Sequence, residues 1–385
     1  MSAATFSNRK LALSPPTLSS GCLLAKDWQE REPTGPLLAK SDIGCSVVRN
    51  GLASGGVLGT NGSEFGLRPD KSTHANQLIE AGTPPRASGQ LGVHLAECRS
   101  LSPESYFTVL VKETAYRVGV APRALGVRAL LQLPRVASHK GWISRRQVQR
   151  ELRICAERLR SDERAARSYV PAEKFQLHDL IFQEVDSGRA LPVLASLHYL
   201  RSARPGSRHF ALVDPIDGLP VTMCSMSPLE WKCVGSRLWR QFAISPDRVG
   251  DVSRVYSVDL APANAVSLLL SRVRKYVRHN RFSVDILVTA VDPNLGFTGS
   301  SYRASNWQQW MSVQARPYLY EDGLYASPRQ LRERFGTSNI SALQANFPEK
   351  FHQSRVKLLD SMIFCFRVNG KTEVLPTAAI RRLHR

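Results

Sequence analysis

The segment 283–307, which reads SVDILVTAVDPNLGFTGSSYRASNW, constrains the fold of this chain more than any other stretch. Its apolar, β-branched first part predicts a buried strand that ends at Asp292. A loop with two glycines follows, and three polar or aromatic side chains come directly after it: Tyr302, Asn306 and Trp307. Because Tyr302 and Asn306 are four residues apart, a helix here would place them on one face. Sites in α/β folds form at such strand ends, but an aromatic helix that only packs on a core also fits.

The segment 252–277 predicts a second strand followed by a helix. The strand covers 253–260, and Pro262 suits an early helical position because its missing N–H costs nothing there. The first turn contains Asn264 and Ser267, and apolar residues then recur at helical spacing: Val266, Leu269, Leu270, Val273 and Val277. A helix that begins directly after a strand suits a phosphate group. The loop has no Gly-rich phosphate motif, so a plain β-α unit explains the segment at least as well.

Together the two segments resemble the Mom-type DNA modification proteins of phages. The shared pattern is a strand with an arginine, a Pro/Asn/Ser helix start, an Asp-Pro strand end, a Gly-x-x-Gly loop and Tyr-x-Ala-x-x-Trp. Two flanking segments also fit: a pair of adjacent strands in 209–226, and a Gly turn before a basic helix in 317–336. The likeness covers roughly residues 191–365. The family often has a histidine between the loop glycines, where this chain has Phe297, so the role of that histidine is not carried over.

The resemblance implies a divergent GNAT (N-acetyltransferase-like) fold that modifies the exocyclic amine of adenine in DNA. The expected class is α/β (α+β), with a GNAT-like mixed sheet flanked by helices. An antiparallel start followed by a central β-α-β unit suits this fold better than an ordinary doubly wound sheet. The implied donor is an acyl-CoA such as acetyl-CoA, and the implied acceptor is adenine N6.

The same resemblance suggests which residues do the chemistry. Tyr302 would donate or accept a proton near the acyl carbon, and Asp292 would orient the amine or accept a proton. Ser267 is a third catalytic candidate, and it would also hold the donor together with Asn264 and Arg254. Each of these residues also fits a purely structural role. Tyr302 could pack in the core, Asp292 could stabilise a turn, Asn264 and Ser267 could cap a helix, and Arg254 could lie at a surface strand edge.

The acceptor base would be recognised by two further residues of the same segment. Asn306 would pair with an adenine edge, and a flipped adenine would stack on Trp307 and Tyr302. The alternative for both aromatic residues is core packing. The nine histidines form no HxxxH or HExxH motif, so the sequence contains no metal signature, although a site assembled from distant residues stays open.

The charge of the chain indicates a polyanionic partner. Lys and Arg number 52 against 32 Asp and Glu, a net charge of +20, which favours nucleic acid over a membrane surface. The excess lies mainly after residue 100, so it belongs to the part with periodic patterns. We therefore expect DNA to be the macromolecular partner.

Residues 101–170 predict a basic module of three helices. The third has an apolar stripe of Ile143, Val148, Leu152, Cys155 and Leu159. Its exposed side would carry four arginines: Arg145, Arg146, Arg150 and Arg153. The order resembles a helix-turn-helix, with Arg145, Arg146 and Arg150 as candidate nucleic-acid ligands. A small bundle with a solvated basic helix fits equally well.

The rest of the chain divides around this module. Residues 1–100 contain 12 of the 25 glycines and are rich in Ser and Pro without lasting periodicity, which predicts mostly disorder. Residues 171–385 would form the catalytic domain, with helices at 175–185 and 191–202 and a closing hairpin at 361–375. The seven scattered cysteines and the lack of a long apolar run indicate free thiols and a cytoplasmic protein of a bacterium or a phage-infected cell.

Three functions remain open from the sequence. The first is a Mom-like enzyme that transfers an acyl- or carbamoyl-type group to adenine N6 in DNA. The second is a GNAT acyltransferase with a protein lysine or a small amine as acceptor. The third is a non-enzymatic DNA-binding regulator whose functional part is 103–170.

Overall fold

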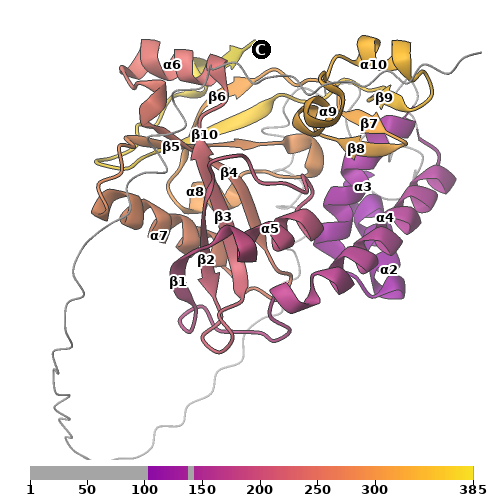
Figure 1. The fold of residues 1–385 in the computed structure, drawn as a ribbon, viewed down its shortest axis with the longest axis horizontal. Helices are drawn as coiled ribbons and strands as arrows, with labels where there is room; N and C mark the ends of the chain where they lie inside the picture. The colour runs from indigo at the N-terminus through magenta and orange to yellow at the C-terminus, as the bar shows by residue number, and fades with distance from the viewer. Residues whose placement is uncertain (1–102, 138–142, 385) are drawn as a thin grey trace, which may run out of the picture. The chain divides into compact units, whose positions relative to one another are not determined.

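An eight-stranded mixed sheet organises the part of the chain that the computed structural model describes, residues 103–137 and 143–384 (Figure 1). The strand order is β1-β2-β3-β4-β5-β10-β6-β11. The bounds are β1 Ile181–Val185, β2 Arg208–Val213, β3 Pro220–Pro228, β4 Val249–Ser257, β5 Ile286–Val291, β6 Gln308–Val313, β10 Ser361–Arg367 and β11 Arg381–Leu383. The prediction of disorder for residues 1–100 lies outside the described residues.

The sheet has the predicted antiparallel start and central β-α-β unit. Strands β1 to β4 pair antiparallel, whereas β4 and β5 pair in parallel and are joined by α7 (Ala265–His279). The predicted α/β class with a mixed sheet flanked by helices is thereby confirmed. The strand predicted at 253–260 begins earlier, at Val249, and ends at Ser257.

Helices cover both faces of the sheet. α6 (Lys232–Phe242) packs against one face, where its Val234 and Leu238 share a core with Ile363 and Cys365 of β10. Side chains alternate along a strand, so the intervening Phe364 and Phe366 point to the other face. There they meet aromatic residues in and just after the short helix α8 (Ser300–Ala304), which contacts α7. α5 (Ser187–Ser196) ends six residues before the predicted end of its helix.

The three predicted helices of the basic module are present. They are α2 (Pro103–Val118), α3 (Pro122–Val136) and α4 (Arg145–Ala165). α4 begins at the N-cap Ser144, whose hydroxyl accepts a hydrogen bond from the N–H of Gln147 at 3.2 Å. The predicted stripe is buried against the other two helices: Ile143, Val148, Leu152, Cys155 and Leu159. The helical core continues into the sheet domain through Leu295, so the module packs directly on the strand end that the sequence singled out.

A second, three-stranded sheet follows β6. Its order is β8-β7-β9, with β7 Leu319–Glu321, β8 Leu324–Ala326 and β9 Phe351–Gln353. The β7–β8 hairpin turns at Asp322-Gly323, where both residues have positive φ, as a two-residue turn requires. The predicted basic helix after this turn is α9 (Pro328–Phe335), which has a capping box between Ser327 and Gln330, and α10 (Ile340–Asn346) follows.

Two predicted elements were wrong. Residues 175–185 contain the edge strand β1 rather than a helix, because alternate side chains engage β2: Phe182 stacks on Phe210, and Glu184 pairs with Arg208. The hairpin at 361–375 does not form. β10 is hydrogen-bonded by β5 on one side and β6 on the other, so no edge is left for a second arm after Gly370.

The four cysteines in the described part of the chain are free: Cys155, Cys224, Cys233 and Cys365. No disulfide therefore links Cys224 to Cys233. Among the same described residues, no helix combines the length and apolar character needed to cross a bilayer.

Candidate active site

β4 and β5 pair over only three residues and then diverge. Residues 249–251 pair with 286–288, whereas β4 continues to Ser257 and β5 to Val291. The register between β3 and β4 shifts at the same level, which makes Ser253 an extra residue in β4. Such a bulge bends a strand and redirects its side chains. The diverging strands therefore leave β4 backbone groups that are not paired with β5, and an extended ligand can meet them there.

Tyr302 lies where the two strands separate. Thr289 of β5 donates a hydrogen bond to the carbonyl of Val252 in β4 at 2.9 Å, and its hydroxyl is 3.4 Å from the Tyr302 hydroxyl. Burial raises the pKa of Tyr302 to about 12, so the phenol is protonated at neutral pH. The ring stacks on Phe364 with centroids 5.8 Å apart. A protonated hydroxyl therefore lies where β4 and β5 separate.

Gly299 allows this close packing. Its φ is +78°, a conformation that favours glycine, and a Cβ there would lie 2.5 Å from the Phe364 ring. The second loop glycine, Gly296, has φ +79°, and a Cβ on it would be 3.4 Å from Leu130 of α3. The Gly-x-x-Gly loop is thus shaped by the sheet on one side and the helical module on the other.

Asp292 anchors the turn after β5 and also binds a tyrosine. One carboxylate oxygen accepts from the backbone N–H of Asn294 at 3.0 Å and from its side-chain amide at 2.8 Å. The other accepts from the Tyr318 hydroxyl at 2.5 Å. Burial, reinforced by Asp292, raises the pKa of Tyr318, so Tyr318 remains the donor. One carboxylate oxygen of Asp292 therefore stabilises the turn, and the other binds Tyr318, which belongs to a distant segment.

Two further residues, which the sequence analysis did not identify, lie near Asp292 and Arg254: Tyr199 and His198. Tyr199 follows α5, and burial together with the negative charge of Asp292 raises its pKa. His198 beside it is buried, its ring centroid 4.6 Å from that of Tyr199, and burial lowers its pKa to about 3. Nδ1 of His198 accepts from the N–H of Leu200 at 3.1 Å, which fixes a neutral imidazole with its proton on Nε2. No local signal links these two residues to the Asp292 loop.

The start of α7 is uncapped by side chains. Asn264 is exposed in the left-handed conformation, with φ +67°, and makes no side-chain capping bond. The Ser267 hydroxyl donates instead to the carbonyl of Ser301, the residue before Tyr302, at 3.3 Å. Neither Asn264 nor Ser267 therefore caps the helix with its side chain. The N–H of Ala265 donates to the carbonyl of Pro262 at 3.2 Å, so among the described residues the N–H groups of Val266 and Ser267 remain available to an anion. The Ser267 hydroxyl ties the helix start to α8.

Arg254 is buried in the sheet, not at a surface edge. It is 8% exposed, and its guanidinium donates to the carbonyls of Ser202 and Ser253, both at 2.6 Å. Burial, together with the nearby charge of Arg204, lowers its pKa to about 10. It lies beside the β4 bulge and, like Tyr302, close to Tyr199.

The predicted shared helical face of Tyr302 and Asn306 is wrong. α8 ends at Ala304, and Asn306 has φ +63°, because the chain turns so that the N–H of Trp307 reaches the carbonyl of Tyr302 at 3.0 Å. Asn306 is exposed. Trp307 is 1% exposed and stacks on Phe366, as its core-packing alternative describes. Its indole N–H has no acceptor among the described residues.

The helical module contacts both the chain after α5 and the loop after β5. Arg128 of α3 donates to the carbonyl of Ser196 at 2.7 Å, just before His198, and Asp162 of α4 pairs with both Arg128 and Arg201. The basic candidates lie elsewhere, on the exposed side of α4: Arg145, Arg146 and Arg150. In the described ranges, no three His, Cys, Asp or Glu side chains gather as metal ligands.

Residues 179–364 match the model of the Mom protein family, which confirms the resemblance seen in the sequence over that segment. The matched range contains β4, α7, β5 and α8, and with them all the candidate residues of the strand opening. No curated protein matches the chain.

Several solved structures are similar to part of the chain. The ribosomal-protein-S5-alanine acetyltransferase from Vibrio fischeri is 8% identical, with 52% of this chain and 100% of that chain covered and a TM-score of 0.29. An N-acetyltransferase from Staphylococcus aureus Mu50 is 9% identical, covering 55% and 92%, with a TM-score of 0.24. A GNAT family acetyltransferase from Elizabethkingia anophelis with acetyl-CoA bound is 12% identical, covering 49% and 98%, with a TM-score of 0.24.

Proposed function

We propose that this protein is a DNA modification enzyme that transfers an acyl- or carbamoyl-type group from an acyl-CoA to adenine N6. The observation that carries the proposal is the divergence of β4 and β5, with Tyr302 beside Thr289 of β5 and Asp292 directly after β5. The match of residues 179–364 to the Mom protein family supports DNA as the substrate, as the sequence resemblance implied.

The chain has the groups that an acyl-CoA donor requires. The uncapped start of α7 would hold its phosphates, with Asn264 at the rim. The unpaired backbone of β4 would meet the amides of the pantetheine arm, and Ser267 fixes α7 beside this path. When bound, the donor supplies an activated acyl carbon that an amine can attack.

Tyr302 would act as a proton donor in the transfer. Its raised pKa makes it a poor base at neutral pH but keeps its proton available. Among the described residues the hydroxyl makes one long contact, at 3.4 Å to Thr289, so it is free to bond the developing oxyanion or to protonate the leaving sulfur. Because Trp307 and Phe364 hold the ring, this geometry exists before the donor binds.

Asp292 would orient the acceptor amine. Its carboxylate is fixed by Asn294 and Tyr318, and so presents a negative charge in one direction. An adenine amine carries N–H groups that such a charge attracts, and it must lose a proton when the new bond forms. Tyr199 and Tyr318 would then lie beside the adenine, which must flip out of the DNA stack to reach them.

DNA would contact two separate parts of the protein. Asn306 is exposed beyond Tyr302 and is placed to meet the edge of a flipped base. The arginines on the exposed side of α4 would bind backbone phosphates without reading sequence. Trp307 would support Tyr302 from below instead of stacking on the base.

Mass spectrometry of nucleosides from the DNA of cells that express the protein tests this proposal. We expect a deoxyadenosine with added mass that is absent from cells expressing Tyr302→Phe. New acyl groups on lysines or small amines, with unmodified DNA, would instead support the acyltransferase alternative. DNA binding without any transfer or acyl-CoA binding would support the regulator.

A further inference from the structure

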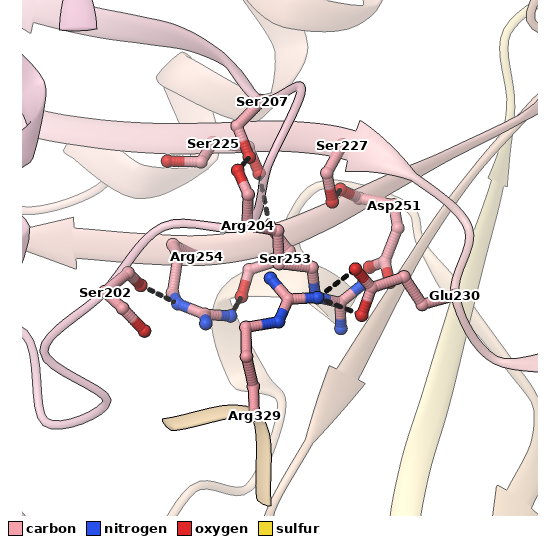
Figure 2. Close-up of polar contacts among 10 residues, drawn as sticks. All are labelled: Ser202, Arg204, Ser207, Ser225, Ser227, Glu230, Asp251, Ser253, Arg254 and Arg329. Atoms are coloured by element: carbon pink, nitrogen blue, oxygen red, sulfur yellow. Dashed lines mark hydrogen bonds and ion pairs between the residues drawn. The ribbon is translucent and has the colours of Figure 1, made fainter. Parts of the chain in front are cut away.

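Three guanidinium groups gather beside the β4 bulge, as Figure 2 shows. Arg204 precedes β2, Arg254 belongs to β4, and Arg329 lies on α9. Arg204 and Arg329 pair with two carboxylates. Arg204 pairs with Asp251 and, at 3.8 Å, with Glu230, and Arg329 pairs with Glu230. The cluster therefore contains three positive charges and two negative charges.

Arg254 is the guanidinium without a carboxylate. Among the described residues it forms no ion pair, and both of its hydrogen bonds go to neutral carbonyls, those of Ser202 and Ser253. A buried cation is expensive unless an anion accompanies it. Arg329 also has an unused donor, since its buried Nη1 has no acceptor in the described part of the chain.

A purely structural role explains only part of this arrangement. Arg254 does tie the Ser202 loop to β4, but that tie leaves the excess charge and the Arg329 donor unexplained. The serines around the cluster do not compensate, because their hydroxyls bond to backbone carbonyls: Ser207 to Arg204, Ser227 to Asp251 and Ser253 to Ser225. The cluster thus has an unused donor and an excess of one positive charge.

The cluster lies next to the reacting end of the proposed site. Asp251 is the last β4 residue that pairs with β5, and with Thr289 it lines a small hollow beside the sheet. Thr289 in turn lies beside the Tyr302 hydroxyl. The phosphates of the donor would sit at the start of α7 instead, so the cluster faces the acyl end of the donor.

We infer that Arg204, Arg254 and Arg329 bind a carboxylate carried on the acyl group of the donor. This inference rests on the proposed function, whose donor class it narrows. A carboxylate supplies the single missing charge, and its two oxygens match the paired N–H groups of a guanidinium. A dianionic phosphate would bring more negative charge than the cluster lacks.

Calorimetric titration of the full chain with three donors tests this inference. Malonyl-CoA and succinyl-CoA add a free carboxylate to the acyl end, and acetyl-CoA has none. We expect the carboxylated donors to bind about tenfold more tightly or better, the effect of one charge-assisted contact. Arg329→Gln should bring the affinity ratio towards one, and Arg332→Gln on the same helix should not. Glu230→Gln should increase the ratio, because Glu230 competes for Arg204 and Arg329.

The outcomes separate this inference from the proposed function. Equal affinity for all three donors overturns the carboxylate site and leaves acyl-CoA binding intact. If none of the CoA donors binds, the Tm of the protein is measured with added succinate and with added inorganic phosphate. A rise in Tm with succinate that Arg329→Gln abolishes would keep the carboxylate site while the donor class fails. No rise, or an equal rise with phosphate, overturns the inference.

Discussion

The hydroxyl of Tyr318 lies 2.5 Å from a carboxylate oxygen of Asp292. This bond joins the chain just before β7 to the end of β5, across 26 residues of sequence. Tyr318 also packs against the core of the helical module. Three parts of the structure therefore meet at the carboxylate that we expect to orient the acceptor amine.

Tyr318→Phe should lower the modification rate about tenfold or more, because Asp292 loses a charge-assisted hydrogen bond. The rate is measured on DNA by nucleoside mass spectrometry. Tyr320→Phe is the matched control: its hydroxyl donates to the carbonyl of Leu131, away from Asp292, so stability should fall by about 1 kcal/mol at unchanged rate. Equal rates for both variants would remove Tyr318 from the site.

Tyr302→Phe should reduce the modification rate by about two to four orders of magnitude, the scale of losing one acid/base or oxyanion group. Folding and DNA affinity should hardly change, since in the described part of the chain the hydroxyl makes one long contact, to Thr289. Tyr116→Phe, at a side chain 91% exposed on α2, serves as a control. A wild-type rate in Tyr302→Phe would return this residue to a packing role.

DNA binding should weaken steeply with salt, because contacts between arginines and phosphates release counterions. The double variant Arg146→Gln/Arg150→Gln should reduce the slope of log K against log salt by about two. Fluorescence anisotropy with a labelled duplex measures both. Arg240→Gln on α6 is a control of the same chemistry on another exposed surface. If the double variant has the same slope of log K against log salt as the wild type, these α4 arginines do not contact the DNA phosphates.

Stability should fall as the pH drops from about 6.5 towards 3, because buried His198 stays neutral in the folded state while the unfolded chain binds a proton. The folded pKa is the lower one, so the stability is present above the unfolded pKa and is lost on acidification. His198 contributes about 1.4 kcal/mol per pH unit at most. Urea unfolding between pH 7 and 5 should show a flatter profile in His198→Gln than in the exposed control His279→Gln. Identical profiles would contradict a neutral buried His198.

The periodicity of the sequence determined the local elements and their buried faces. The apolar stripe of α4 and most of the α7 stripe were readable, because a helix repeats its core face every three or four residues. The strand that ends at Asp292 and the glycine loop after it were readable for the same local reason. The family resemblance added the order of these elements and the expectation of a mixed sheet.

Only the tertiary structure decided which residues meet. Tyr199, Arg254, Asp292 and Tyr318 come from four separate segments. No local pattern records that Arg254 and Asp292 lie near Tyr199, or that Tyr318 bonds to Asp292. The place of β10 between β5 and β6 depends on which strands bury the same faces, which hydrophobic pattern alone does not rank. The burial of Trp307 was likewise set by Phe366, a partner 59 residues away. Sequence periodicity reports which face of an element is buried, whereas the site depends on long-range packing between elements.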